Sequence, residues 1–243
     1  MTGKTLTGRV PPECIRRLEI PRLQPALLDQ LRDLDDLTGT LSDAMDDLGL
    51  FAALPASTLR PSLPGQRVVG HAVTVRNTER PDTVTAAAAG KAGRMGEHEA
   101  YNLAEPGDVV VIEGLHGVSN MGGQSATLAH RSGCAGAVID GSHRDPQASV
   151  ACGFPIWSRG LTPITGKWRL QTAEINGRVR IAGITVDAGD LVAADEAGLV
   201  FVPFPRATEV VAREMLIAAG DLRQKRDIAA GISLRDLATT RYK

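Results

Sequence analysis

Two short apolar segments, joined by one helix-forming stretch, constrain the fold of this chain more than any other feature of its sequence. The segments read VVVIE at residues 109–113 and GAVID at residues 136–140. Between them, a glycine-rich turn leads into a helical pattern from about Gln124 to Arg131. Parallel strands need a crossover of about this length, usually a helix. The spacing therefore predicts a βαβ unit within an α/β sheet.

The remaining patterns extend this interpretation along the chain. Helices are expected over about residues 24–37, over residues 40–50 with a cap near Thr40 or Ser42, over much of residues 83–108, and over about residues 206–230. Short strands are expected at residues 67–77, at 154–160 and in the segments from 179 to 203. We expect one domain over residues 1–243, with a helical N-terminal arm (about 1–50), a core (about 60–205) and a projecting C-terminal helix (about 206–230).

Composition excludes several classes of function. The chain has 243 residues, of which 27 are Lys or Arg and 28 are Asp or Glu, and its charges form no block of one sign. A nucleic-acid or membrane partner held by bulk electrostatics is therefore not expected. No apolar run approaches the roughly 20 residues of a membrane span. Its three cysteines have no CxxC spacing, and the N-terminus lacks a signal-like apolar core, so we expect a cytoplasmic protein.

Chemistry is expected where the two strands of the βαβ unit end, because ligands of α/β sheets bind outside the carboxyl ends of strands. After the first strand, the turn Gly122–Ser125 brings backbone N–H groups and the positive end of a helix dipole to one spot, which suits a carboxylate or phosphate. After the second strand, Asp140 is expected to end the strand and Gly141 to make a turn. Arg144 then offers a fork for an oxyanion, and Asp145 offers hard oxygens for a divalent cation.

Each of these features also has an ordinary structural explanation. A glycine-rich turn before a helix is structural more often than it binds an anion, and an Arg-Asp pair on a loop is usually a solvated ion pair. His98 lies in MGEHEA, but no second histidine follows at the HExxH spacing, which excludes that zinc-protease motif. Asp43 and Asp221 fall on polar faces of expected helices. The occurrence of the glycine-rich turn and the Arg-Asp pair at successive strand ends nevertheless favours a site.

The order of motifs resembles that of the RraA-like superfamily. The motifs are SDAMDDLG, GHAVTV, PGDVVVIEG, GxxGAVIDGxxRD, FPIWSRG and VDAGDLVAADEAGLVFVP, with a terminal helix closing on IAAG, and they cover about residues 40–231. The superfamily includes 4-hydroxy-4-methyl-2-oxoglutarate and 4-carboxy-4-hydroxy-2-oxoadipate aldolases, and also ribonuclease regulators that bind partner proteins and carry the same Arg-Asp pair. The resemblance implies a swivelling β/β/α fold, assembled as a homotrimer or a dimer of trimers with active sites between subunits.

The resemblance also implies roles for individual residues. Asp145 matches the one direct protein ligand of Mg2+ or Mn2+ in the aldolases, and Arg144 matches the arginine that holds the oxo acid and its enolate oxygen. Gly122–Ser125 match the turn whose amides receive the pyruvate carboxylate, and His98 matches a histidine near the site. From a neighbouring subunit, Asp43 and Asp221 match acidic side chains that hold water or assist proton transfer, with aspartate here where glutamate is usual.

One departure from the aldolase pattern concerns the turn itself. The aldolases place an acid after the turn's glycine, as in GDLLA, whereas this chain has Gly123 there, followed by Gln124 and Ser125 in place of apolar residues. Losing such an outer carboxylate commonly costs about 10–100-fold in metal affinity or activity. Restoring it by Gly123→Asp is therefore expected to tighten Mn2+ binding.

These observations lead to one functional hypothesis and two alternatives. The hypothesis is a Mg2+- or Mn2+-dependent lyase that cleaves a 4-hydroxy-2-oxo acid to pyruvate and decarboxylates oxaloacetate. Its catalytic residues are Arg144, Asp43, His98 and Asp221, and its metal ligand is Asp145. The alternatives are a non-catalytic regulator that binds another protein, and an isomerase or hydrolase adapted to another small acid. The sequence does not choose among substrates.

Overall fold

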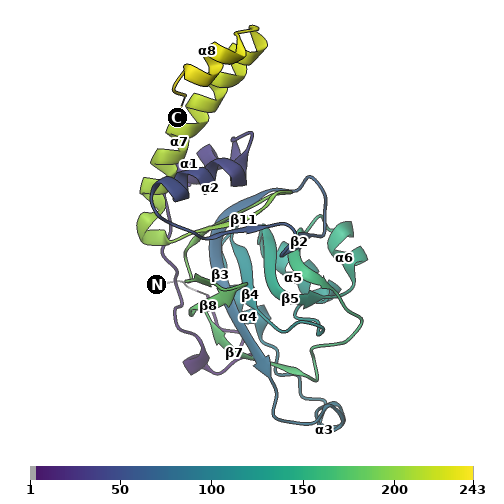
Figure 1. Ribbon diagram of the computed structural model, residues 1–243. Helices are drawn as coiled ribbons and strands as arrows, with labels where there is room; N and C mark the ends of the chain where they lie inside the picture. The colour runs from purple at the N-terminus through teal and green to yellow at the C-terminus, as the bar shows by residue number, and fades with distance from the viewer. Residues whose placement is uncertain (1–3, 243) are drawn as a thin grey trace.

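The computed structural model describes residues 4–242 and shows an α/β domain from which a long C-terminal helix projects (Figure 1). Its strands are β1 (Ala53–Pro55), β2 (Arg60–Pro61), β3 (Val68–Glu79), β4 (Val109–Glu113), β5 (Gly136–His143), β6 (Ile156–Leu161), β7 (Leu170–Ile175), β8 (Val179–Ile181), β9 (Ile184–Val186), β10 (Leu191–Ala194) and β11 (Gly198–Val202). Its α-helices are α1 (Pro25–Arg32), α2 (Leu37–Asp47), α3 (Val84–Ala89), α4 (Glu97–Leu103), α5 (Gly123–Arg131), α6 (Pro146–Ala151), α7 (Ala207–Ala229) and α8 (Leu234–Thr239). The expected α/β class, N-terminal helices and long C-terminal helix are confirmed.

A parallel group of strands forms the centre of the sheet. β3 pairs with β4, β4 with β5 and β5 with β6, all in parallel, and α5 connects β4 to β5. Across the described residues, the sheet order is β1-β11-β10-β3-β4-β5-β6-β2, with β7 antiparallel to the second half of β3. The predicted βαβ unit is confirmed. Its two strands place their carboxyl ends at the same edge of the sheet.

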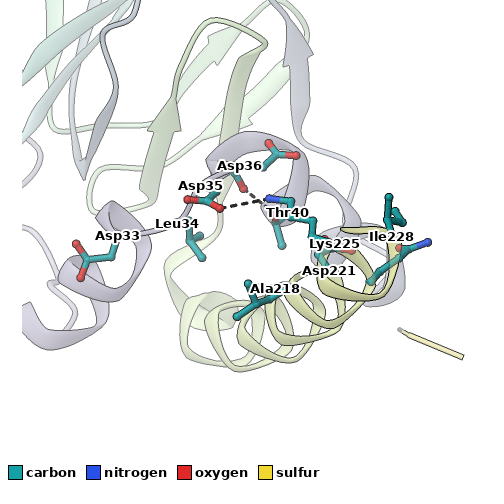
Figure 2. Close-up of a pocket in the computed structure, with 11 residues that line it drawn as sticks. Asp33, Leu34, Asp35, Asp36, Thr40, Ala218, Asp221, Lys225 and Ile228 are labelled. Atoms are coloured by element: carbon teal, nitrogen blue, oxygen red, sulfur yellow. Dashed lines mark hydrogen bonds and ion pairs between the residues drawn. The ribbon is translucent and has the colours of Figure 1, made fainter. Parts of the chain in front are cut away.

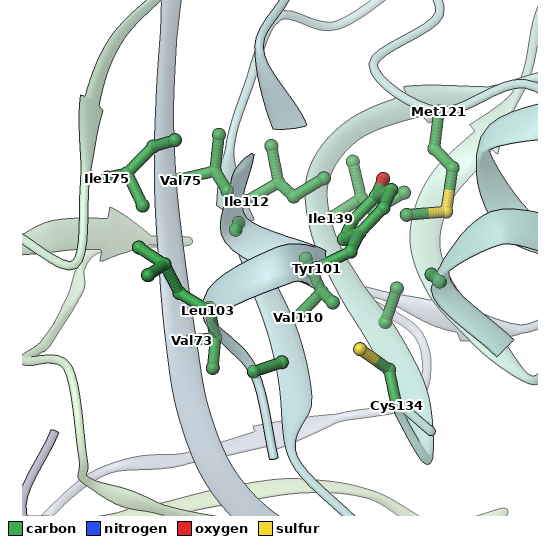
Figure 3. Packing of buried hydrophobic residues seen from close by; sticks show 14 of the residues in the cluster. Val73, Val75, Tyr101, Leu103, Val110, Ile112, Met121, Cys134, Ile139 and Ile175 are labelled. Carbon is green, nitrogen blue, oxygen red and sulfur yellow. The ribbon is translucent and has the colours of Figure 1, made fainter. Parts of the chain in front are cut away.

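Both faces of this parallel centre are buried. On one face, Tyr101 of α4 packs in a cluster with Ile112 of β4 and Ile139 of β5 (Figure 3). On the other face, Val111 belongs to a second cluster that includes Trp157 of β6 and residues of the β8–β9 hairpin. Strands covered on both faces need apolar side chains at consecutive positions. This explains why the segments read as continuous apolar runs rather than alternating ones.

The N-terminal helices differ from the expected boundaries. α1 ends at Arg32, and α2 begins at Leu37. The cap of α2 is the Asp36 side chain, which accepts a hydrogen bond from the Gly39 N–H at 3.1 Å. The prediction of a cap near Thr40 was therefore wrong, because an aspartate placed just before a core leucine satisfies the first free N–H groups of the helix.

The C-terminal helix leaves the domain after its first turns. α7 packs against α2 through buried residues that include Val210, Val211 and Ile217, and its second half extends away from the sheet together with α8 (Figure 1). Large apolar side chains stay exposed on this extension and just before it: Leu216 at 64%, Leu222 at 48%, Ile228 at 56% and Leu234 at 86%. Among residues 4–242, no helix has both the length and the apolar character that crossing a membrane requires.

Candidate active site

The loop between β4 and α5 is held in place by one buried amide side chain. Asn120 accepts a hydrogen bond from the Leu115 N–H at 3.1 Å and donates to the carbonyl oxygens of Leu115 and Ser142. Its own N–H donates to the Ser142 carbonyl, and the Arg144 N–H donates to the Met121 carbonyl at 3.1 Å. These bonds fix the loop against the end of β5. The start of α5 and the Arg-Asp pair therefore lie side by side.

Asp145 occupies a strained backbone conformation at the end of β5. Its φ of 58° and ψ of 50° lie in the left-handed region, where a non-glycine residue costs of order 1 kcal/mol. Its Oδ2 accepts a hydrogen bond from the Gly123 N–H at 3.1 Å and lies 3.4 Å from the Arg144 Nε. Its side chain is 53% exposed, and no hydrogen bond within the described residues engages Oδ1. One oxygen fixes the carboxylate, and the other is accessible to a ligand.

Gly122 and Gly123 allow this close approach because they lack a Cβ. A Cβ on Gly122 would lie 3.2 Å from the Arg144 Nε and 3.3 Å from the Asp145 Oδ2. A Cβ on Gly123 would lie 2.6 Å from the Cβ of Ala148 in α6, closer than side chains tolerate. Gly123→Asp would therefore push α5 and α6 apart instead of simply restoring an acid. The expected gain in Mn2+ binding from this substitution does not fit the structure.

The end of β5 also differs from the expected turn. The strand continues through Gly141 to His143, so the prediction of a turn at Gly141 was wrong. The glycine is needed for another reason, since a Cβ there would lie 2.5 Å from the Asn120 Nδ2. Asp140 does not line the site, and its Oδ2 accepts a hydrogen bond from the Ala182 N–H at 2.6 Å. Only the last two residues of the motif DGSHRD reach the site.

Arg144, Asp145 and the start of α5 line one cavity of about 410 Å³ at the carboxyl edge of the parallel strands. Its charged residues are three cations, Arg9, Arg144 and Lys167, and two carboxylates, Glu97 and Asp145. Three cations against two carboxylates leave a net charge of +1 when histidine is neutral. The cavity therefore suits an anionic ligand. Its lining is Arg9, Gly93, Met95, Glu97, His98, Ser119, Gly122, Gly123, Gln124, Ser125, Arg144, Asp145, Thr165, Gly166 and Lys167.

Glu97 also lines this cavity, although no motif in the sequence predicts a role for it. It is the first residue of α4 and is 6% exposed. Its Oε1 accepts a hydrogen bond from the Ser125 hydroxyl at 3.1 Å, and the Ser125 Oγ lies 2.8 Å from the Tyr101 hydroxyl. Burial, and after it the charge of Glu97, raise the pKa of Tyr101 well above its usual value. Ser125, expected to bind substrate, thus also joins α4 to α5 through its side chain.

Two further residues enter the cavity from other segments. His98 lies next to Glu97 on α4, and its ring packs edge-on against Tyr101 with ring centroids 5.9 Å apart. Lys167 comes from the loop between β6 and β7, with its Nζ 4.4 Å from the centre of the Trp168 ring. No motif in the sequence pointed to Lys167, because it lies in an irregular segment whose position depends on the tertiary fold.

Asp43 and Asp221 do not line this cavity within one chain. Asp43 is exposed on α2. Asp221 of α7 lines a separate cavity of about 490 Å³ between α7 and the turn that joins α1 to α2 (Figure 2). In the same cavity, the Nζ of Lys225 lies 3.3 Å from Asp35. A single chain thus brings His98 of α4 together with the residues at the strand ends and leaves these two acids in another region.

The chain is similar to known proteins over most of its length. The family model RraA-like, described as Aldolase/RraA, matches residues 38–201. The Protein DlpA of Legionella pneumophila is 27% identical over 215 residues, which cover 86% of this chain, and this chain spans 33% of the length of that protein. A Halalkalibacterium halodurans protein, provisionally named 4-hydroxy-4-methyl-2-oxoglutarate aldolase, is 30% identical over 197 residues, or 80% of this chain and 86% of that protein.

Solved structures agree with these sequence matches. An uncharacterized protein from Pseudomonas syringae is 30% identical with a TM-score of 0.75, covering 90% of this chain and 100% of the other. Streptomyces coelicolor RraAS2, described as an unusual member of the RNase ES inhibitor RraA protein family, is 27% identical with a TM-score of 0.67, covering 87% of this chain and 99% of the other. The fold type implied by the motif order is confirmed.

Proposed function

Because the chain belongs to the RraA-like family, as the match over residues 38–201 shows, we propose that it is a divalent-metal-dependent carbon–carbon lyase. Its reaction is the cleavage of a 4-hydroxy-2-oxo acid to release pyruvate, with oxaloacetate decarboxylation as a companion reaction through the same enolate. The observation that supports this most strongly is one cavity in which Arg144, Asp145 and the first N–H groups of α5 meet. The similarity to the Halalkalibacterium protein supports the same reaction class.

The donor set fits Mg2+ or Mn2+. Among residues 4–242, no three His, Cys, Asp or Glu side chains come together to hold a metal, whereas zinc sites use three or four such ligands. Mg2+ keeps several waters and binds through one or two carboxylates plus its substrate. Asp145 would hold the ion through Oδ1, the oxygen that Gly123 does not use. A bound ion supplies Lewis-acid polarisation of the substrate's 2-oxo group.

The substrate itself is held by Arg144 and by the start of α5. The first N–H groups of a helix have no partners within the helix. The N–H of Gly123 donates to Asp145, which leaves those of Gln124 and Ser125 for the substrate carboxylate. The half-exposed guanidinium of Arg144 donates to the oxygen that gains negative charge as the C–C bond breaks.

Assembly into a homotrimer or hexamer is part of this proposal. The exposed apolar side chains of α7 and α8 have the character of an interface, and closed rings are common among homo-oligomers. In such a ring, Asp43 and Asp221 of a neighbouring copy would complete the site and move protons. The thiols of Cys14, Cys134 and Cys152 are free, which supports a reducing, cytoplasmic location.

Pyruvate release tests the proposal. The purified protein is incubated with a panel of 4-hydroxy-2-oxo acids and oxaloacetate, with Mg2+, with Mn2+ and with a chelator, and pyruvate is measured through lactate dehydrogenase. We expect metal-dependent release from at least one acid. The similarity to RraAS2 favours a second candidate, a regulator that binds a partner protein. No release from any acid, together with inhibition of a ribonuclease, would favour that candidate instead.

A further inference from the structure

Two buried glutamates of α4 differ in how their oxygens are satisfied. Glu99 is fully buried, and its carboxylate accepts hydrogen bonds from the N–H of Thr7 and from the side chain of Asn102, so both oxygens are engaged. Glu97 is also more than nine-tenths buried, but its Oε2 has no partner within the described residues. A buried carboxylate oxygen without a donor is unfavourable. Glu97 therefore requires a donor that residues 4–242 do not supply.

The hydrogen bonds around Glu97 fix its carboxylate at the cavity. A carboxylate only accepts, so the Ser125 hydroxyl must donate its proton to Oε1. The Tyr101 hydroxyl, kept protonated by burial, then donates to Ser125 at 2.8 Å. Each of the two hydroxyl protons is used in these bonds, so neither hydroxyl donates to Oε2. Oε2 itself has almost no accessible surface. Because Glu97 lines the cavity that also holds Arg144 and Asp145, a ligand that moves the cavity wall aside is the available donor.

This arrangement links two departures from the aldolase pattern. The turn has no acid at position 123, and position 125 is a serine, where the resemblance to the aldolases implies a leucine. A leucine could not donate to Glu97, whereas Ser125 does. The close approach of Ala148 also prevents an acid at position 123 from fitting. The cavity thus lacks one carboxylate on α5 and has another on α4, held in place by the serine.

We propose that Glu97 determines substrate specificity by accepting, at Oε2, a hydrogen bond from the 4-hydroxyl group of the oxo acid. This inference rests on the proposed lyase function and narrows its substrate class to hydroxylated 2-oxo acids. Oxaloacetate has no such hydroxyl, and its fourth carbon is a carboxylate that would face the negative charge of Glu97. A specific site both attracts one ligand and repels its competitor. Glu97 does both.

Binding without turnover tests the proposal. The ligands are 2,4-dihydroxybutanoate and 2-hydroxybutanoate, which differ only in the 4-hydroxyl and lack the 2-oxo group that cleavage needs. Calorimetric titration of the whole protein with Mg2+ should show about 10-fold tighter binding of the dihydroxy acid, the usual effect of a hydrogen bond to a charged group. In Glu97→Gln, we expect this preference to fall to about 3-fold or less, because a neutral acceptor is weaker.

Two further variants complete the experiment. Ser125→Ala keeps the charge of Glu97 but removes the group that positions it, so the preference should also fall. Glu214→Gln is the matched control, because Glu214 is a buried glutamate whose carboxylate has no partner in the described part of the chain, and it does not line the cavity. It should keep the wild-type preference. If Glu97→Gln does not fold, the result with Ser125→Ala decides, and a retained preference there overturns the proposal.

The outcomes separate this inference from the lyase function. Equal or undetectable binding of the two acids by the wild-type protein, or a preference that persists in Glu97→Gln, overturns hydroxyl recognition. A preference that depends on Glu97, without pyruvate release from any acid, overturns the lyase and leaves hydroxyl recognition intact. In an active enzyme, Glu97→Gln should also lower the ratio of kcat/KM for a 4-hydroxy-2-oxo acid to that for oxaloacetate.

Discussion

Two cavities in the described residues, one at the edge of the parallel strands and one beside α7, differ in how far a single chain completes them. At the edge of the parallel strands, Asp145 and Glu97 are both held by contacts from the same chain. Between α2 and α7, Glu214 is buried and neither of its oxygens has a partner among the described residues, and Leu222 on the same helix is about half exposed. One chain forms the part of the site that would bind substrate and metal. The other region has the character of an interface, and on our proposal a second copy completes it.

The greatest loss of activity is expected from a substitution in the first region. Asp145→Asn removes the proposed metal ligand but keeps the backbone, because asparagine also tolerates the left-handed conformation. We expect a loss of at least about 100-fold in kcat/KM, since even outer-shell losses reach that size. The rise in melting temperature with Mn2+ should also disappear. Glu196→Gln, an exposed acid in the turn between β10 and β11, should change neither quantity.

Full turnover by Asp145→Asn would show that the metal site does not lie in the first region. Loss of turnover with an unchanged Mn2+ shift in melting temperature would place the metal elsewhere.

The second prediction concerns assembly through α7. Leu222→Lys replaces an apolar side chain that is 48% exposed with a charged one. If α7 forms the interface, the dissociation constant of the oligomer should rise by about 10–100-fold, as expected for about 1.5–3 kcal/mol of lost apolar burial. Sedimentation velocity measures the change. Leu128→Lys is the control, because Leu128 is similarly exposed at 40% but lies on α5. Identical sedimentation of Leu222→Lys and the wild-type protein would contradict an α7 interface.

A smaller effect should appear in the pH dependence of stability. Burial raises the pKa of Glu214 from 4.5 to about 7. Between these two values the unfolded chain has released the proton and the folded chain retains it, so stability falls as the pH rises through this window and levels off above it. Glu214→Met should therefore stabilise the protein by up to about 3 kcal/mol at pH 8 and by less than about 1 kcal/mol at pH 5.

Urea unfolding at equal protein concentration measures this difference. Glu209→Gln, which changes an exposed acid on the same helix, serves as the control. A gain from Glu214→Met that is the same at both pH values would show that packing, and not the burial of an ionisable group, limits the stability of this region.

Much of the fold could be predicted because its strongest signals are local. The apolar runs of β4 and β5 are continuous because both faces of these strands are covered, and the crossover helix α5 begins within one residue of its expected start. Other features depend on long-range contacts. β5 extends to His143 because Ser142 and His143 pair with Gly160 and Leu161 of β6, and the Asn120 side chain bonds the Ser142 carbonyl.

Residue patterns alone predicted the site only where it follows strand ends, and His98 of α4 was expected only from the resemblance to the aldolases. Gly122–Ser125, Arg144 and Asp145 lie together because the ends of β4 and β5 do. Glu97 could not be predicted from MGEHEA, because no local pattern shows that its carboxylate would meet Ser125. The partners of Asp43 and Asp221 are a separate case, because their proposed contacts lie between chains and no single chain displays them.

On our proposal, the two regions meet only between copies of the chain, and an experiment that mixes two variants can show whether they do. Asp145→Asn and Asp221→Asn proteins are refolded together in equal amounts, and activity and mixed trimers are followed by pyruvate release and native mass spectrometry. With random assembly in a cyclic trimer, a site is intact when one chain supplies Asp145 and its neighbour supplies Asp221. This happens with probability one half times one half, so about a quarter of wild-type activity should return. Activity that stays at the level of the separate variants, with mixed trimers present, would contradict a site shared between chains.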